Sequence, residues 1–233
     1  MIVVPAIDLR GGRAVRLRHG DPAHETAYSD DPVEAARGFE ADGASLLHVV
    51  DLDAALGTGH NREVVAAICQ GVSVPVQTGG GLRSLQAVDA ALARGAARIV
   101  LGTSAARDPE FVRRADARHG DRVVVALDVR EGRVMVRGWQ EPAGRLEDVI
   151  AKLDAPRFLV TSIGVDGTLE GPDLELYRTV LALTERPVLA SGGVQGPGDL
   201  RALHAVGVEG VVVGKALYEG TLTLRDALHE ARR

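Results

Sequence analysis

The chain has 233 residues, 45% of them hydrophobic, and 27 Lys and Arg stand against 32 Asp and Glu, a net charge of −5. This charge excludes a general attraction to nucleic acid or anionic membrane, so an anionic ligand must be held by local groups. No run approaches the ~20 apolar residues of a membrane span and the start lacks a secretory pattern, so we expect a cytoplasmic protein. The single cysteine, Cys69, excludes an internal disulfide and is expected to be a buried small hydrophobe on a helix.

Short apolar runs alternate with amphipathic stretches along the chain. The runs predict buried parallel strands at residues 2–7, 46–50, 74–77, 98–101, 123–127, 157–161, 187–190 and 210–213. The stretches predict helices near 32–42, 62–70, 84–94, 108–118, 145–154, 173–184, 197–206 and 221–231. This alternation favours a single (β/α)₈ TIM barrel over residues 1–233, and a doubly wound open sheet is the alternative.

Capping residues mark several of these helices. Asp31-Pro32 and Asp108-Pro109 place Asp at an N-cap and Pro in the first turn. Gly43, Gly95 and Gly207 stand where three helices should end.

An internal repeat divides the chain into two halves. Residues 6–15 recur as residues 126–135, with Ala, Asp, Arg, Gly and Arg identical. Gly79-Gly80 matches Gly192-Gly193 at an offset of 113, and Gly102-Thr103 matches Gly214-Lys215 at 112. The repeat predicts two related half-barrels, the second carrying a small hairpin extension at residues 130–138.

Glycine-rich segments follow four of the expected strands, where barrels hold their ligands. Glycine lets successive backbone N–H groups approach an anion closely, which favours phosphate. Two such sets predict two phosphates at opposite rims of the barrel mouth, and therefore an elongated bisphosphate that lies across it. The alternative is that these glycines only form tight turns after the strands. The residues are Gly79, Gly80, Gly81, Gly102 and Thr103, and then Ser191, Gly192, Gly193, Gly214 and Lys215.

Asp8 and Asp128 end the first and fifth strands, which face each other across an eight-stranded barrel. A substrate spanning the mouth would pass between them, which suits acid–base chemistry. A loop cap, or an ion pair with a neighbouring arginine, is the alternative for either aspartate. Thr161 could hydrogen-bond a reacting atom, and Asp166 could orient it or merely brace an Asp-Gly turn.

Three loop side chains are further candidates. Arg16, in the loop after the first strand, and Arg83 are either phosphate clamps or solvated arginines. Trp139 is either an exposed anchor or a stacking surface for a flat ring. His19, His24, His48 and His60 show no metal-ligand spacing, so we expect no metal site.

Several segments together resemble the phosphoribosylformimino-aminoimidazole carboxamide ribotide isomerases of histidine biosynthesis, over essentially the whole chain. These segments are residues 5–9, 12–17, 48–53, 79–83, 138–139, 166–169 and 191–193. The resemblance implies a (β/α)₈ barrel and an Amadori rearrangement, without metal or cofactor, of a bisphosphate aminoaldose ribotide to an aminoketose. It also implies that Asp8 is the general base and Asp128 the general acid. Family positions that assist or contact substrate are matched by Thr161, Asp166, Arg16, Arg83 and Trp139.

Three other functions are alternatives. The sister cyclase family has Cys in the first strand and Lys at position 16, whereas this chain has Ala6 and Arg16. Residues 137–139 and 214–218 resemble a bifunctional isomerase that also acts on phosphoribosylanthranilate. In that enzyme's reaction, Arg137 could meet the carboxylate of the anthranilate substrate. A non-catalytic phospho-metabolite-binding barrel is the third. The expected partner is a bisphosphate ribotide, with no nucleic acid or membrane, and the chain is expected to be a monomer.

Overall fold

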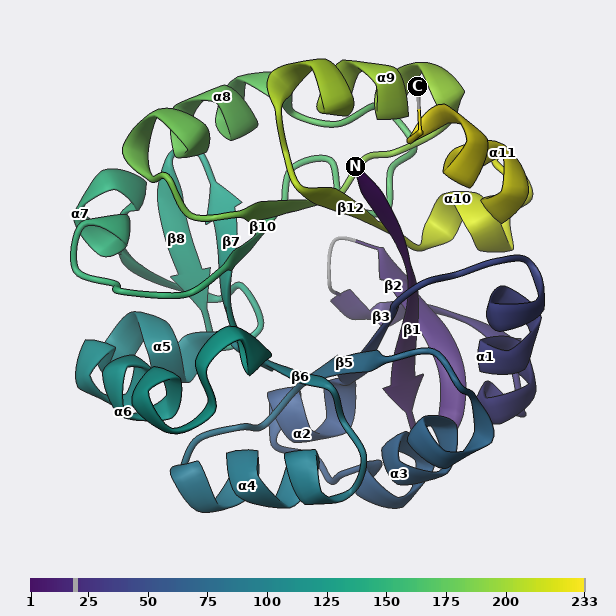
Figure 1. Ribbon diagram of the computed structural model, residues 1–233, viewed down its shortest axis with the longest axis horizontal. Coiled ribbons are helices and arrows are strands. Elements are labelled where there is room, and N and C mark those ends of the chain that lie inside the picture. Colours follow the sequence, from purple (N-terminus) through teal and green to yellow (C-terminus); the bar gives the residue numbers. More distant parts are fainter. Residues whose placement is uncertain (19–20, 233) are drawn as a thin grey trace.

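The computed structural model describes residues 1–18 and 21–232, so His19 lies outside the described residues. Eight parallel strands form a closed barrel, because β10 pairs with β7 and β12 with β1 (Figure 1). The closed ring excludes the open doubly wound sheet. The strands are β1 (Ile2–Arg10), β4 (Leu47–Asp51), β5 (Val76–Gly79), β6 (Arg98–Leu101), β7 (Val123–Arg130), β10 (Phe158–Ser162), β11 (Val188–Ser191) and β12 (Gly210–Val213).

Helices surround this barrel (Figure 1), and all eight predicted helices are present. They are α1 (Pro32–Ala41), α3 (Arg62–Gly71), α4 (Leu85–Ala93), α6 (Pro109–His119), α7 (Leu146–Ile150), α8 (Leu174–Leu183), α9 (Pro197–Val206) and α11 (Leu224–Glu230). Three short helices that the sequence did not predict follow β4, β6 and β12: α2 (Leu52–Leu56), α5 (Thr103–Arg107) and α10 (Lys215–Tyr218). Helices of one turn are too short to show a periodicity.

The predicted caps are confirmed. The Asp31 side chain accepts hydrogen bonds from the N–H groups of Val33 and Glu34 at 3.0 Å each, which satisfies donors at the start of α1. Asp108 does the same for Phe111 at the start of α6. Gly43, Gly95 and Gly207 follow their helices with φ of 99°, 108° and 98°, a region that favours glycine.

Two antiparallel hairpins extend the barrel, one in each half. β1 pairs with β2 (Arg13–Arg18) and β7 with β8 (Arg133–Val136), in the same register 120 residues apart. The second hairpin was predicted and the first was not. Arg16 therefore stands in a strand and not in a loop. β2 pairs further with β3 (Asp21–Ser29), and β8 with β9 (Glu141–Arg145).

The backbone corrects the predicted match between the two glycine sets by one residue. Gly80 and Gly192 have φ of 105° and 102°, while Gly81 and Gly193 have 68° and 82°. The true offset is therefore 112, and Gly79 corresponds to Ser191. Three consecutive glycines look alike in a sequence, and only their conformations distinguish them.

Two layers of apolar side chains hold the barrel together. Inside it lie Val4, Ala6, Leu46, Val100, Val124, Leu159, Leu189 and Val212. A larger cluster, which includes Val3, Ile7 and Leu47, packs between strands and helices. The Met1 ammonium donates to the Ala231 carbonyl at 3.3 Å, so the two ends of the described chain meet.

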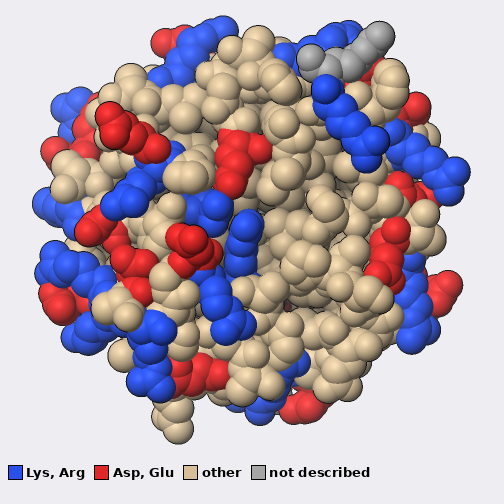
Figure 2. All heavy atoms as spheres, viewed as in Figure 1, with Lys and Arg blue, Asp and Glu red and all other residues tan. Residues whose placement is uncertain are grey.

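Acidic and basic side chains are interspersed around the rim of the face shown in Figure 2, in agreement with the small net charge. Within residues 1–18 and 21–232, no helix has both the length and the apolarity needed to cross a membrane.

Candidate active site

A cavity of about 290 Å³ opens at the carboxyl ends of the barrel strands. The predicted site residues that line it are Asp8, Arg16, Gly79, Gly80, Gly81, Arg83, Gly102, Thr103, Asp128, Trp139, Thr161, Asp166, Ser191, Gly192, Gly193, Gly214 and Lys215. Because most of them lie near or after the carboxyl ends of the barrel strands, the closed barrel gathers residues that are far apart in sequence.

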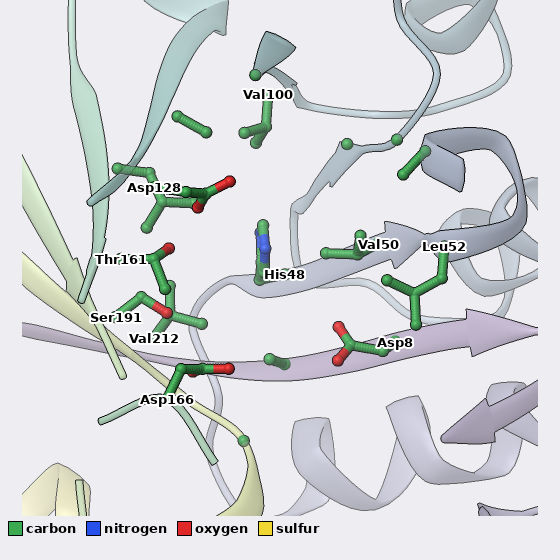
Figure 3. Close-up of a pocket in the computed structure, with 18 of the residues that line it drawn as sticks. Asp8, His48, Val50, Leu52, Val100, Asp128, Thr161, Asp166, Ser191 and Val212 are labelled. Carbon is green, nitrogen blue, oxygen red and sulfur yellow. The ribbon is translucent and has the colours of Figure 1, made fainter. Parts of the chain in front are cut away.

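Asp8 and Asp128 both point into this cavity, from β1 and β7 respectively (Figure 3). Asp128 is level with Thr161 of the neighbouring β10 in the strand register. The two carboxylates therefore face one space, as the internal repeat predicted.

Burial raises the pKa of the Asp128 carboxyl above its usual range. Asp128 also accepts hydrogen bonds from the Trp139 indole N–H and the Thr161 hydroxyl, which lower the pKa without cancelling the effect of burial. The environment thus favours the protonated form, as a proton donor requires.

Asp8 lies in a different environment, because the Arg16 guanidinium donates a hydrogen bond to its carboxylate. Burial alone lowers the pKa of Arg16, but the charges of Asp8 and Asp166 outweigh it, and the pKa is raised overall. Arg16 therefore stays charged. An ion pair with a neighbouring arginine was the alternative for Asp8, and Arg16 forms it, whereas Arg10 pairs with Glu25 at 2.6 Å.

The Arg16 guanidinium also lies against the glycine that follows β12. A Cβ atom added to Gly214 would sit 1.0 Å from Arg16 Nη2. Arg16 Nε is buried and has no hydrogen-bond partner among the described residues. A charged group with an unused N–H donor thus lies beside the second glycine set, where an anion can accept that hydrogen bond.

Gly214→Ala is expected to displace Arg16 from Asp8 and to lower the free energy of unfolding by about 1–3 kcal/mol. Gly102→Ala is the matched control, since Gly102 follows β6 in the first half and a Cβ there meets nothing within 4 Å. Urea denaturation of both variants measures the difference. Equal stability of the two variants would contradict this position of Arg16.

His48 is a site residue that the sequence analysis did not assign a role. It lines the cavity from β4 between the two aspartates (Figure 3), and its Nδ1 lies 2.9 Å from the Gln77 amide nitrogen. The amide donates this hydrogen bond, so the neutral ring carries its proton on Nε2. Burial lowers the pKa of His48 to about 4. The two nearby charges act in opposite directions, since Asp8 raises this pKa and Arg16 lowers it. The sequence did contain a signal for this position: His48 and Val50 alternate along a buried strand, so both side chains face the inside of the barrel.

His48 should make the protein sensitive to mild acid. Between about pH 6.5 and pH 4 the unfolded chain binds a proton on this ring and the folded chain does not, so stability falls as the pH falls. The loss amounts to about 3 kcal/mol. His48→Gln should remove most of it. Urea denaturation at about pH 7 and pH 4.5 measures this, with His204→Gln on the exposed side of α9 as the control.

Arg137 is the one predicted site residue outside the cavity. Its side chain is 58% exposed and pairs with Glu141 at 2.7 Å. Besides Arg16, two cations line the cavity: Arg83 donates to the Ala54 and Ala55 carbonyls, and Lys215 Nζ donates to the Gly167 carbonyl at 2.8 Å. In the described part of the chain, no three His, Cys, Asp or Glu side chains are grouped as metal ligands would be.

Known proteins resemble this chain over its full length. A family model described as histidine biosynthesis protein matches residues 2–223. The chain is 52% identical over 232 residues to an imidazole-4-carboxamide isomerase of Frankia alni, covering 98% of this chain and 94% of that protein. It is 48% identical to the isomerase of the same name from Acidothermus cellulolyticus, covering 99% and 98%. It is also 48% identical to phosphoribosyl isomerase A of Streptomyces griseus, covering 97% and 96%. The chain therefore belongs to the histidine biosynthesis protein family, as one of its isomerases.

Proposed function

We propose that the protein catalyses the Amadori rearrangement of a bisphosphate aminoaldose ribotide, the imidazole-4-carboxamide substrate of its relatives, to the aminoketose. One observation carries the proposal. Two carboxylates face one cavity, and their surroundings differ: burial raises the pKa of Asp128, whereas Asp8 is paired with Arg16. Such a pair supplies one proton donor and one proton acceptor at the same pH.

The reaction needs two proton transfers at neighbouring carbons. Protonated Asp128 gives its proton to the ribose ring oxygen, the bond from that oxygen to C1 breaks, and a Schiff base forms between C1 and nitrogen. Ionised Asp8 then takes the proton from C2, and the electron pair moves to give an enolamine. Proton return to C1 with loss of the C2 hydroxyl proton yields the ketone. Thr161 and Trp139 hold the Asp128 carboxyl by hydrogen bonds while this occurs.

Binding is assigned to the two glycine sets. The segments Gly79–Gly81 and Ser191–Gly193 come from β5 and β11, on opposite sides of the barrel, and both line the same cavity, with Arg83 near the first set. Arg16 and Lys215 lie at the second set and supply positive charge. A phosphate at the second set takes the unused Arg16 Nε donor and draws Arg16 away from Asp8, which frees the base.

The test combines an assay and a ligand-bound structure. The purified protein should convert the aminoaldose ribotide without added metal. A crystal soaked with the ribotide should hold one phosphate at each glycine set. Tight binding without conversion would favour a non-catalytic phosphate-binding barrel instead. Phosphate at one set only would overturn the bisphosphate assignment.

A second activity on phosphoribosylanthranilate remains a separate prediction. Arg137, which would meet the anthranilate carboxylate, must first leave Glu141 and enter the cavity. The backbone next to it is unusual, since Arg137, Gly138 and Trp139 have φ of 55°, 64° and 69°. Turnover of phosphoribosylanthranilate that is lost in Arg137→Ala would establish this activity, and absence of turnover would reject it.

A further inference from the structure

A second cavity, of about 330 Å³, lies outside the barrel between α3 and α4. It reaches the back of the Gly79–Gly81 loop, whose other side lines the active-site cavity. Cys69, expected to be buried, is only half-buried and lines this space from α3. The volume is at the low end of small-molecule sites, which span about 300–1,000 Å³.

The second half of the barrel shows what fills the equivalent space. Helices α3 and α8 begin and end 112 residues apart, and so do the starts of α4 and α9. Val65 on α3 therefore corresponds to Tyr177 on α8. Tyr177 is fully buried; its hydroxyl donates to the Ser191 carbonyl at 2.7 Å and accepts from the Ser191 N–H at 3.2 Å.

Three wall residues of the first half are smaller than their counterparts in the second half. Val65 stands in place of Tyr177, and Ala91 in place of Leu203, which is fully buried. Cys69 likewise replaces a leucine, at position 181. The first half thus lacks the phenol ring that closes the second half, and the cavity occupies the corresponding position.

We propose that this cavity binds a small phenol, a single aromatic ring that carries a hydroxyl group. The ring takes the position that Tyr177 takes in the second half. Gly79 corresponds to Ser191 and lines the cavity, so its N–H and carbonyl are the groups that meet the ligand hydroxyl. An occupant also restrains the Gly79–Gly81 loop, and so couples the cavity to the active site.

The probe is 4-methylphenol, which is the tyrosine side chain without a backbone. It should raise the melting temperature of the protein in a saturable way, because it binds the folded state. It should also slow alkylation of Cys69 by iodoacetamide, since the thiol lines the same space. Toluene, which lacks the hydroxyl, should bind at least tenfold more weakly.

Two variants make the test specific. Val65→Tyr should itself raise the melting temperature by about 2–4 °C and abolish both effects of the probe. Ala91→Leu fills the cavity from the opposite wall and should abolish them too, whereas Val65→Ala should keep them. The proposal is overturned if 4-methylphenol leaves Cys69 alkylation unchanged in the unmodified protein, or slows it equally in the two filled variants.

Discussion

Replacing Asp128 with asparagine is expected to lower kcat by about 10²–10⁴-fold while KM for the ribotide stays within a few-fold. Asparagine has the same shape and can still accept hydrogen bonds from Trp139 and Thr161, but it has no proton to give. Steady-state kinetics with the aminoaldose ribotide measure the effect. Asp148→Asn, at an exposed carboxyl on α7, is the control and should be unaffected.

The same substitution should change the pH dependence of stability. Burial raises the pKa of Asp128 above that of the unfolded chain, so the folded state holds its proton to higher pH. Stability from this group is therefore present at low pH and is lost as the pH rises through the folded-state pKa. Asp128→Asn escapes this loss, so its melting temperature should exceed that of the unmodified protein increasingly with pH. A kcat near normal, or no gain in stability at neutral pH, would contradict the buried-acid assignment.

Most of the barrel could be predicted because its signals are local and strong. A continuous apolar run such as residues 123–127, which begins with three valines, favours a strand buried on both faces. Asp31 followed by Pro32 specifies a helix start through chemistry that acts within four residues. Once the strands close into a ring, the residues at their carboxyl ends lie together at the barrel mouth and form the site.

The features that escaped prediction depend on groups far apart in the chain. The pKa of His48 is low because the fold buries the ring inside the barrel, and Arg16, which comes from a different strand, lowers it further. Arg16 lies against Gly214, almost 200 positions away, and sequence offers no measure of that approach. The possible role of Arg137 came from the resemblance of residues 137–139 to the bifunctional isomerases, which does not say where the side chain lies; in the structure it pairs with Glu141 outside the cavity.

Asp8→Asn is expected to reduce kcat by about 10²–10⁴-fold as well, for a different chemical reason. The variant can still open the ribose ring with Asp128, but it has no carboxylate to take the C2 proton. It also frees Arg16 from its ion pair, so the ribotide should bind as tightly as before or more tightly.

A substrate deuterated at C2 distinguishes the two aspartates. In Asp8→Asn the removal of that deuteron becomes the slowest step, so a large primary isotope effect on kcat should appear. In Asp128→Asn ring opening becomes slowest, and the isotope effect should approach one. The reverse pattern would exchange the roles of base and acid. A large isotope effect in both variants would mean that removal of the C2 proton is the slowest step even without the Asp128 carboxyl. Asp128 would then not be the proton donor for ring opening.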